Sequence, residues 1–145
     1  MTEPLHCLRV SDKTLAAVEF MPDGKLYVAG VEPTVKRWDP ATGETDQTLL
    51  GHGGPVIAMA TAVNGRLLGT CSMDGSAWIW LTAYGAKAFA LKGFKGIPAS
   101  ITFAPDASIC VTGASDTVVR VHELERGKLT HEFEGHKGEV LAVAI

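Results

Sequence analysis

Four residues of one stretch could do chemistry together: His52, Thr70, Asp74 and Trp80. An imidazole, a hydroxyl and a carboxylate are the groups of a hydrolytic triad, in which the imidazole activates the hydroxyl as a nucleophile. The same groups can instead form a closed hydrogen-bonded set, and a buried tryptophan needs such a partner for its indole N–H. The choice between the two depends on the elements that position these side chains.

A regular interval relates these residues to the rest of the chain. Gly51-His52 recurs as Gly93-Phe94 and as Gly135-His136 (93 − 51 = 42; 135 − 93 = 42). The same interval separates members of three further sets, which are Thr70 and Thr112, Asp74 and Asp116, and Trp38, Trp80 and His122. One period held by several independent positions indicates a supersecondary unit copied along the chain. A period of this length, with Gly-His near the start and Trp-Asp near the end, is typical of a propeller blade.

Each copy contains four short apolar alternations between turn signals, which predict the strands of an antiparallel meander. They are expected at 15–20, 26–29, 35–38 and 47–50 in the first copy, at 56–60, 67–71, 77–81 and 87–91 in the second, and at 99–103, 109–113, 118–122 and 129–133 in the third. No segment sustains a helical period. The sequence therefore predicts an all-β fold of β-propeller blades, each a four-stranded antiparallel meander.

The copies divide residues 1–145 into blade 1 at about 11–50, blade 2 at about 51–92 and blade 3 at about 93–134. Leu5 to Val10 is expected to be the last strand of a preceding blade, and 136–145 the first strand of a following one. Closed propellers have about 4–8 blades, so three blades plus a strand at each end predict an incomplete or oligomer-completed propeller. Two explanations stay open: a piece of a longer protein, or copies that self-associate through open blade edges.

The period and the residues that keep it resemble the WD-repeat family. The resemblance implies a structural tetrad in which the Trp80 indole N–H reaches the Thr70 hydroxyl, the hydroxyl meets His52, and Asp74 orients His52. A closed network of this kind fixes strand register and ties the loop that opens the blade to the turn between its second and third strands. We therefore expect these residues to be structural, and the chain to contain no catalytic residue.

The other copies keep the tetrad only in part. The third retains Thr112 and Asp116, but Phe94 replaces the histidine and His122 replaces the tryptophan. With no indole to satisfy, the histidine is less needed, and we expect Phe94 to pack apolar surface.

In the first copy Trp38 is followed by Asp39, but the tetrad positions hold Val10, Val28 and Glu32. Trp38 is therefore expected to be held by packing. His136 opens the next copy and is expected to be a blade-type histidine.

Bulk properties exclude several classes. The net charge is −3 and the sequence pI about 5.9, whereas nucleic-acid-binding domains have a basic face. RNA contact is therefore expected only indirectly, through an assembly. Three widely spaced cysteines fit a reducing compartment, and no apolar run approaches the length of about 18 residues that would predict a membrane span. His131 and His136 lack further ligands near in sequence, and Gly51–Gly54 precedes a strand rather than a helix, so no metal, phosphate or other cofactor is expected.

The chain is accordingly predicted to be a non-catalytic protein–protein interaction scaffold, a subunit of a multi-subunit complex. Lys92, Phe94, Lys95 and Lys137 lie in loops that a propeller gathers on one face, where partners of the family commonly dock. The alternative is a peptide or modified-residue reader that uses the central face of a completed ring.

A narrower resemblance concerns the second blade. Trp80–Gly85, Phe89 and Gly93–Gly96, with the preceding segment up to Met59, look like blades of a tandem-propeller subunit of the small-subunit processome, the U3 small nucleolar ribonucleoprotein. This resemblance implies a longer, nucleolar or nuclear protein of ribosome biogenesis. Without it, the prediction is a cytoplasmic location.

Overall fold

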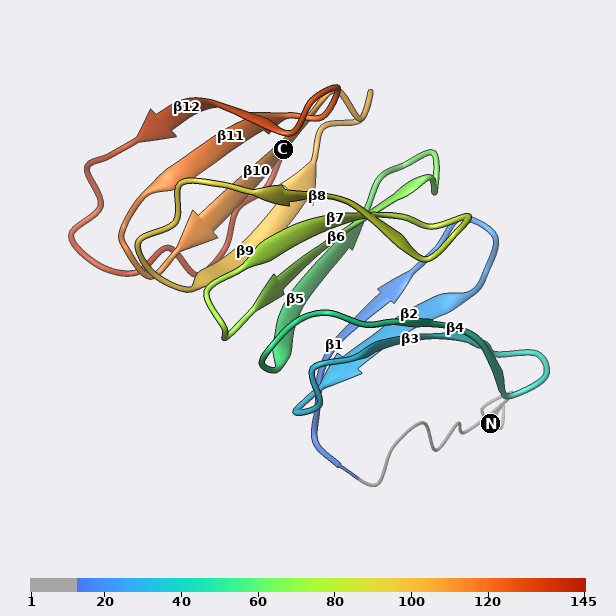
Figure 1. The fold of residues 1–145 in the computed structure, drawn as a ribbon. Coiled ribbons are helices and arrows are strands. Elements are labelled where there is room, and N and C mark those ends of the chain that lie inside the picture. The colour runs from blue at the N-terminus through green and yellow to red at the C-terminus, as the bar shows by residue number, and fades with distance from the viewer. Residues whose placement is uncertain (1–12) are drawn as a thin grey trace, which may run out of the picture.

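A computed structural model describes residues 13–145, and these fold into three separate four-stranded sheets without a helix (Figure 1). The strands of each sheet follow one another in chain order, and all neighbours are antiparallel. Figure 1 shows the three sheets side by side, in the order of the chain. The expected all-β fold of four-stranded meanders is confirmed.

Blade 1 contains β1 (Leu15–Phe20), β2 (Leu26–Gly30), β3 (Val35–Asp39) and β4 (Glu44–Leu49). Blade 2 contains β5 (Val56–Thr61), β6 (Leu67–Ser72), β7 (Ala77–Leu81) and β8 (Ala86–Leu91). Blade 3 contains β9 (Pro98–Phe103), β10 (Ile109–Ala114), β11 (Val119–Glu123) and β12 (Lys128–Phe133). Every strand expected in residues 15–133 is present. β4 begins earlier than expected because the turn closes at Gly43, whose N–H donates to the Asp39 carbonyl at 2.8 Å, so that pairing starts with Asp39 opposite Glu44.

Each blade has two faces, since side chains alternate along a strand. We call the face toward the next blade in the chain its leading face, and the face toward the preceding blade its trailing face. The leading face of blade 1 packs on the trailing face of blade 2 through Tyr27, Val35 and Leu49 against Val56, Leu68 and Trp80. The leading face of blade 2 packs on blade 3 through Cys71, Ile79 and Leu91 against Ile101, Phe103 and Cys110. Burying one such aliphatic or aromatic side chain stabilises the fold by about 1.5–3 kcal/mol.

Polar contacts fix how neighbouring blades meet. The Glu19 carboxylate accepts hydrogen bonds from the backbone N–H and the hydroxyl of Thr61, at 2.9 and 2.8 Å. Farther from β1 and β5, Gln47 donates to the Thr82 carbonyl at 2.9 Å and accepts from the Tyr27 hydroxyl at 2.7 Å. Blades 1 and 2 are therefore held together both where β1 meets β5 and where β4 meets the β7–β8 turn.

The sequence also predicts a strand at each end of the chain. Leu5 to Val10 lies outside the described residues. Residues 136–145, expected to begin a further blade, carry no strand. Val140 contacts blade 3, where its N–H donates to the Ala114 carbonyl at 3.1 Å. A strand needs a paired neighbour for its backbone groups, and blade 3 already pairs its own four. In residues 13–145 there is no helix with the length and hydropathy needed to cross a bilayer.

Two turns of blade 3 place ordinary residues where blade 2 has glycine. Gly65 and Gly75 have φ of +68° and +86°, and their counterparts Ala107 and Thr117 have φ of +56° and +70°. A β-branched residue in this left-handed region is strained by about 1–3 kcal/mol.

We expect Thr117→Gly to raise the free energy of unfolding by about 1 kcal/mol, because glycine adopts this conformation without a Cβ clash. Urea unfolding followed by circular dichroism measures the change. The reverse substitution in blade 2, Gly75→Thr, serves as the matched control and should lower stability. Equal stability of Thr117→Gly and the unchanged protein would contradict strain at this turn.

Candidate functional site

The chemistry-bearing residues of blade 2 lie in one buried chain of hydrogen bonds on its trailing face. Trp80 on β7 donates its indole N–H to the Thr70 hydroxyl on β6 at 2.9 Å. The Thr70 Oγ1 lies 2.7 Å from His52 Nε2, and His52 Nδ1 lies 2.8 Å from the hydroxyl of Ser76. Ser76 Oγ in turn donates to the Asp74 carboxylate at 2.5 Å. We call these five side chains the clasp.

The donors and acceptors of the clasp fit one direction only. The Trp80 indole can only donate and the Asp74 carboxylate can only accept, so each hydroxyl between them gives its single proton onward. Thr70 therefore donates to His52 Nε2, and His52 Nδ1–H donates to Ser76. This order assigns His52 as the neutral tautomer protonated on Nδ1. Every polar group of the clasp has a hydrogen-bond partner, as buried polar groups require.

Burial controls the electrostatics of the histidine. His52 is 6% exposed and stacks on the Trp78 ring at 4.3 Å between centroids. Burial lowers the pKa of His52 below its ordinary value of 6.5, and the charge of Asp74, 3.6 Å from Nδ1, offsets this only in part. For Asp74, burial would raise the pKa, but hydrogen bonds from Ser76 and from the Gly53 N–H outweigh it and hold the pKa below 3.8. The clasp thus combines a neutral imidazole with an ionised carboxylate.

The aspartates also tie loops of the same blade together. Asp74 accepts from the Gly53 N–H at 2.6 Å, which joins the β6–β7 turn to the loop between β4 and β5. Asp116 does the same in blade 3, where it accepts from the Lys95 N–H at 2.8 Å. The same corner of each blade is therefore braced by one carboxylate. Both loops lie at the same end of their blades.

Blade 3 replaces the clasp with a different network. Arg120 stands at the position of Trp78 (78 + 42 = 120) and is 1% exposed. Its guanidinium pairs with Asp116 at 2.8 Å and with Glu132 at 2.9 Å, and it lies 5.2 Å from the centre of the Phe94 ring. Phe94 thus packs against a cation and, at 6.1 Å between centroids, against His122. An ion network braces this blade where aromatic rings brace blade 2.

No hydrogen bond joins Thr112 and His122. His122 Nε2 lies 2.9 Å from the Lys92 carbonyl, so this nitrogen carries the proton. Thr112 Oγ1 and His122 Nδ1 are buried without a hydrogen-bond partner among the described residues. Burial lowers the pKa of His122, and the hydrogen bond to Lys92 offsets this in part. The imidazole is shorter than the indole it replaces and turns to a different acceptor.

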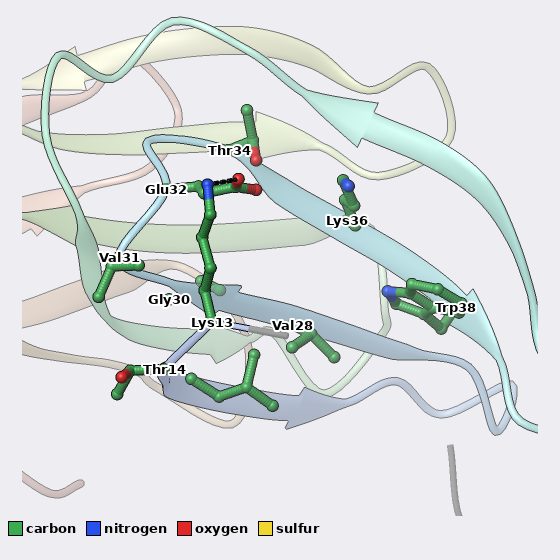
Figure 2. A pocket seen from close by; sticks show the side chains of 11 residues that line it. Lys13, Thr14, Val28, Gly30, Val31, Glu32, Thr34, Lys36 and Trp38 are labelled. Atoms are coloured by element: carbon green, nitrogen blue, oxygen red, sulfur yellow. Dashed lines mark hydrogen bonds and ion pairs between the residues drawn. The ribbon is translucent and has the colours of Figure 1, made fainter. Parts of the chain in front are cut away.

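In blade 1 the corresponding face holds a small pocket. Figure 2 shows Trp38 and Val28 among the residues that line it, together with Lys13 and Glu32. The Lys13 ammonium lies 2.7 Å from the Glu32 carboxylate. Val28 occupies the place of Thr70 (70 − 42 = 28), so this position offers Trp38 no hydroxyl. Val10 lies outside the described residues. Blade 1 has the tryptophan of the clasp without its hydroxyl.

The loop residues expected to contact partners lie at the end of the blades where Asp74 and Asp116 brace their loops. Lys92, Lys95 and Lys137 are exposed and Phe94 is half-buried. His136 is exposed, and it lines a polar cleft of about 380 Å³ together with Lys95, Arg120 and Glu134. Among residues 13–145, no three histidine, cysteine or carboxylate side chains are grouped as metal ligands would be.

Three side chains of these networks were missed in the sequence. Ser76, Trp78 and Arg120 stand at positions that change between copies, so the period does not mark them. A signal existed for Ser76, because a hydroxyl two residues after Asp74 can bond back to that carboxylate in a turn. For Arg120, the signal was a cation four residues after Asp116.

Comparison with known proteins adds an independent observation. Residues 43–80 match the family described as WD domain, G-beta repeat. These residues hold all five members of the clasp, and the sheets on either side repeat the same meander. The comparisons support the WD40 repeat family. The three four-stranded antiparallel sheets are consistent with WD40 β-propeller blades in an incomplete set.

The relatives that match this chain are longer proteins. It is 30% identical over 86 residues to eukaryotic translation initiation factor 3 subunit I of Scheffersomyces stipitis. This alignment covers 59% of the chain and 25% of the relative. It is 28% identical to pre-mRNA-processing factor 19 homolog 2 of Arabidopsis thaliana, over 97% of the chain and 28% of the relative. It is 25% identical to apoptotic protease-activating factor 1 of Rattus norvegicus, over 90% of the chain and 10% of the relative. The chain therefore spans less than a third of each of these relatives, and none of the three is named as a processome subunit.

We expect His52→Ala to lower the free energy of unfolding by about 1–3 kcal/mol, because the Thr70 and Ser76 hydroxyls each lose a buried partner. Urea unfolding measures the loss. His136→Ala, at an exposed histidine, is the matched control and should change stability by less than about 0.5 kcal/mol. Equal stability of the two variants would contradict a bracing role for His52.

We expect stability to fall as the pH is lowered from about 7.5 to 5.5. Folding lowers the pKa of both His52 and His122 below 6.5, so the folded state binds fewer protons than the unfolded state in this window. The stability that the two neutral histidines contribute is fully present above pH 6.5. It is lost as the pH falls from there through their lowered pKa values in the folded state. Unfolding curves at several pH values test this, and His52→Gln with His122→Gln should flatten the dependence. A stability independent of pH in the unchanged protein would contradict it.

A double substitution tests whether Phe94 and His122 depart from the clasp together. Phe94→His with His122→Trp would give Thr112 an indole donor and an imidazole acceptor. We expect the double variant to be more stable than the sum of the two single changes by about 0.5–3 kcal/mol in a double-mutant cycle. Additive effects would show that the two positions act independently.

Proposed function

We propose that this chain is a non-catalytic protein-interaction scaffold that acts as a subunit of a multi-protein assembly. The observation that carries the proposal is the closed clasp. Its imidazole and its Thr70 hydroxyl are buried and fully engaged with each other, so neither faces a substrate. What the blades present to solvent is a set of braced loops. Rigid loops on a repeated scaffold are suited to docking other proteins.

The docking face is proposed to be the end where Asp74 and Asp116 brace their loops. There the polar cleft brings Lys95 and His136 together with the carboxylates of Glu132 and Glu134. Lys92 and Lys137 extend the basic part of this face. Mixed charges of this kind set partner specificity and association rate more than affinity.

The matched relatives support an assembly subunit in general terms. Two carry names that refer to a translation initiation factor and a pre-mRNA-processing factor, of which the first is called a subunit. We extend to this chain only the general role, an intracellular subunit with protein partners. The narrower proposal, ribosome biogenesis in the nucleolus, rests on the short segments Trp80–Gly85 and Gly93–Gly96.

Affinity purification of the tagged chain from cells, with quantitative mass spectrometry of the co-purified proteins, tests the proposal. We expect a defined set of proteins whose recovery falls about tenfold with Lys95→Glu, equal to about 1.4 kcal/mol of binding. Lys128→Glu, at the start of β12 and outside the polar cleft, is the matched control and should leave recovery unchanged.

Each outcome has a distinct meaning. Equal recovery with both variants would overturn the proposed docking face. No protein recovered above a tag-only control would overturn the scaffold function. Ribosome-assembly proteins in the set would support the narrower proposal, and their absence from a defined set would remove it.

A further inference from the structure

The leading face of blade 3 carries the residue positions that are buried in both existing blade interfaces. Leu49 of blade 1 and Leu91 of blade 2 are 1% and 4% exposed, whereas Phe133, at the same position of blade 3, is 55% exposed. Beside it, Val119 and Val121 are half-buried, and their blade 2 counterparts Ala77 and Ile79 are 0% exposed. Blade 3 therefore presents the first half of a blade interface to solvent.

The trailing face of blade 1 presents the second half. Phe20 pairs with Leu26 as Phe103 pairs with Cys110, so the two phenylalanines are equivalent. Phe103 is packed between blades and is 7% exposed, but Phe20 is 66% exposed and its neighbour Val18 is 53% exposed. Trp38 lies on the same face and is half-buried (Figure 2).

A contact at the outer strands identifies how these halves fit. In the first interface Gln47 lies against Gly85, where an added Cβ would come within 3.0 Å of its side chain, and in the second Phe89 lies against Gly127, where the gap would be only 2.5 Å. The next members of these two series are His131 on β12 (89 + 42 = 131) and Gly43 (85 − 42 = 43). His131 is exposed, and Gly43 has φ of +73°, like Gly85 at +62°. The next contact of the series would therefore place His131 of one copy on Gly43 of another.

We propose that two copies of this chain associate head to tail, with the leading face of blade 3 on the trailing face of blade 1 of the second copy. The occupant is a second copy because each chain carries both complementary halves of an interface that it already makes twice internally. Such an interface is heterologous, so association proceeds to a closed ring or to a longer array. The proposal is independent of the scaffold function, since it concerns a different surface.

The segment after β12 must yield for this contact. Val140 lies against Gly113 on the leading face of blade 3, in the place that Thr14 would take in the second copy (140 − 126 = 14). Beyond it, Leu141 and Ile145 are 70% and 57% exposed. Val140 is 7% exposed and donates to the Ala114 carbonyl at 3.1 Å, so these are the contacts that the second copy must replace. Few buried contacts hold residues 141–145.

Complementary variants test the proposal by light scattering and analytical ultracentrifugation of the 145-residue chain over a range of concentrations. The unchanged protein is expected to show a mass that rises with concentration. Phe133→Glu blocks the leading face and Phe20→Glu blocks the trailing face, so each variant alone is expected to be monomeric. A mixture of the two leaves one intact pair of faces and should form a heterodimer of twice the monomer mass that grows no further.

Tyr84→Glu is the control, because Tyr84 is 81% exposed in the β7–β8 turn, outside both faces, and should associate like the unchanged protein. Circular dichroism confirms that each variant is folded. A monomeric unchanged protein at all concentrations would overturn the proposal. Association of either single variant would overturn the head-to-tail geometry, because a face-to-like-face contact needs only one kind of face.

Discussion

A buried indole N–H must have a hydrogen-bond partner, and the architecture of blade 2 depends on how this requirement is met. Trp80 fills the trailing face of the blade, where it packs under blade 1. Its N–H is satisfied by Thr70, and that hydroxyl then requires an acceptor, which is His52. Each hydrogen bond in the clasp leads to the next one, from His52 through Ser76 to the exposed carboxylate of Asp74. A single series of hydrogen bonds, all donated in one direction, thus joins the core of the blade to its surface loops.

The same requirement explains why copies of one unit differ. Where His122 replaces the tryptophan, the indole is gone, and the aromatic ring of Phe94 can replace the imidazole. The corner is then braced by Arg120 between two carboxylates. Both solutions anchor an aspartate that holds the backbone of the preceding loop. The feature common to both blades is this anchor, and the groups behind it vary. A rigid loop end is what a docking surface needs, whichever network holds it.

Much of this could be predicted from the sequence because it depends on spacing. The period and the turn signals predict all the strands of residues 15–133, since a meander is a local structure. The pairing of Trp80 with Thr70 and His52 follows from positions shared with a family. Ser76 and Arg120 could not be found in this way, because they differ between copies and their roles depend on three-dimensional neighbours. The strand expected at 136–145 depends on pairing with strands of another blade, which local pattern does not supply.

The central claim is that the imidazole of His52 is neutral and is held by hydrogen bonds to Thr70 and Ser76 within the blade. Nitrogen NMR of the histidine rings tests it most directly. At about pH 7.5, above the ordinary histidine pKa, the account predicts that His52 carries its proton on Nδ1, with Nε2 unprotonated and accepting from Thr70. It also predicts that His52 titrates below the ordinary value. A proton on Nε2, or titration at the value of an exposed histidine, would contradict the account.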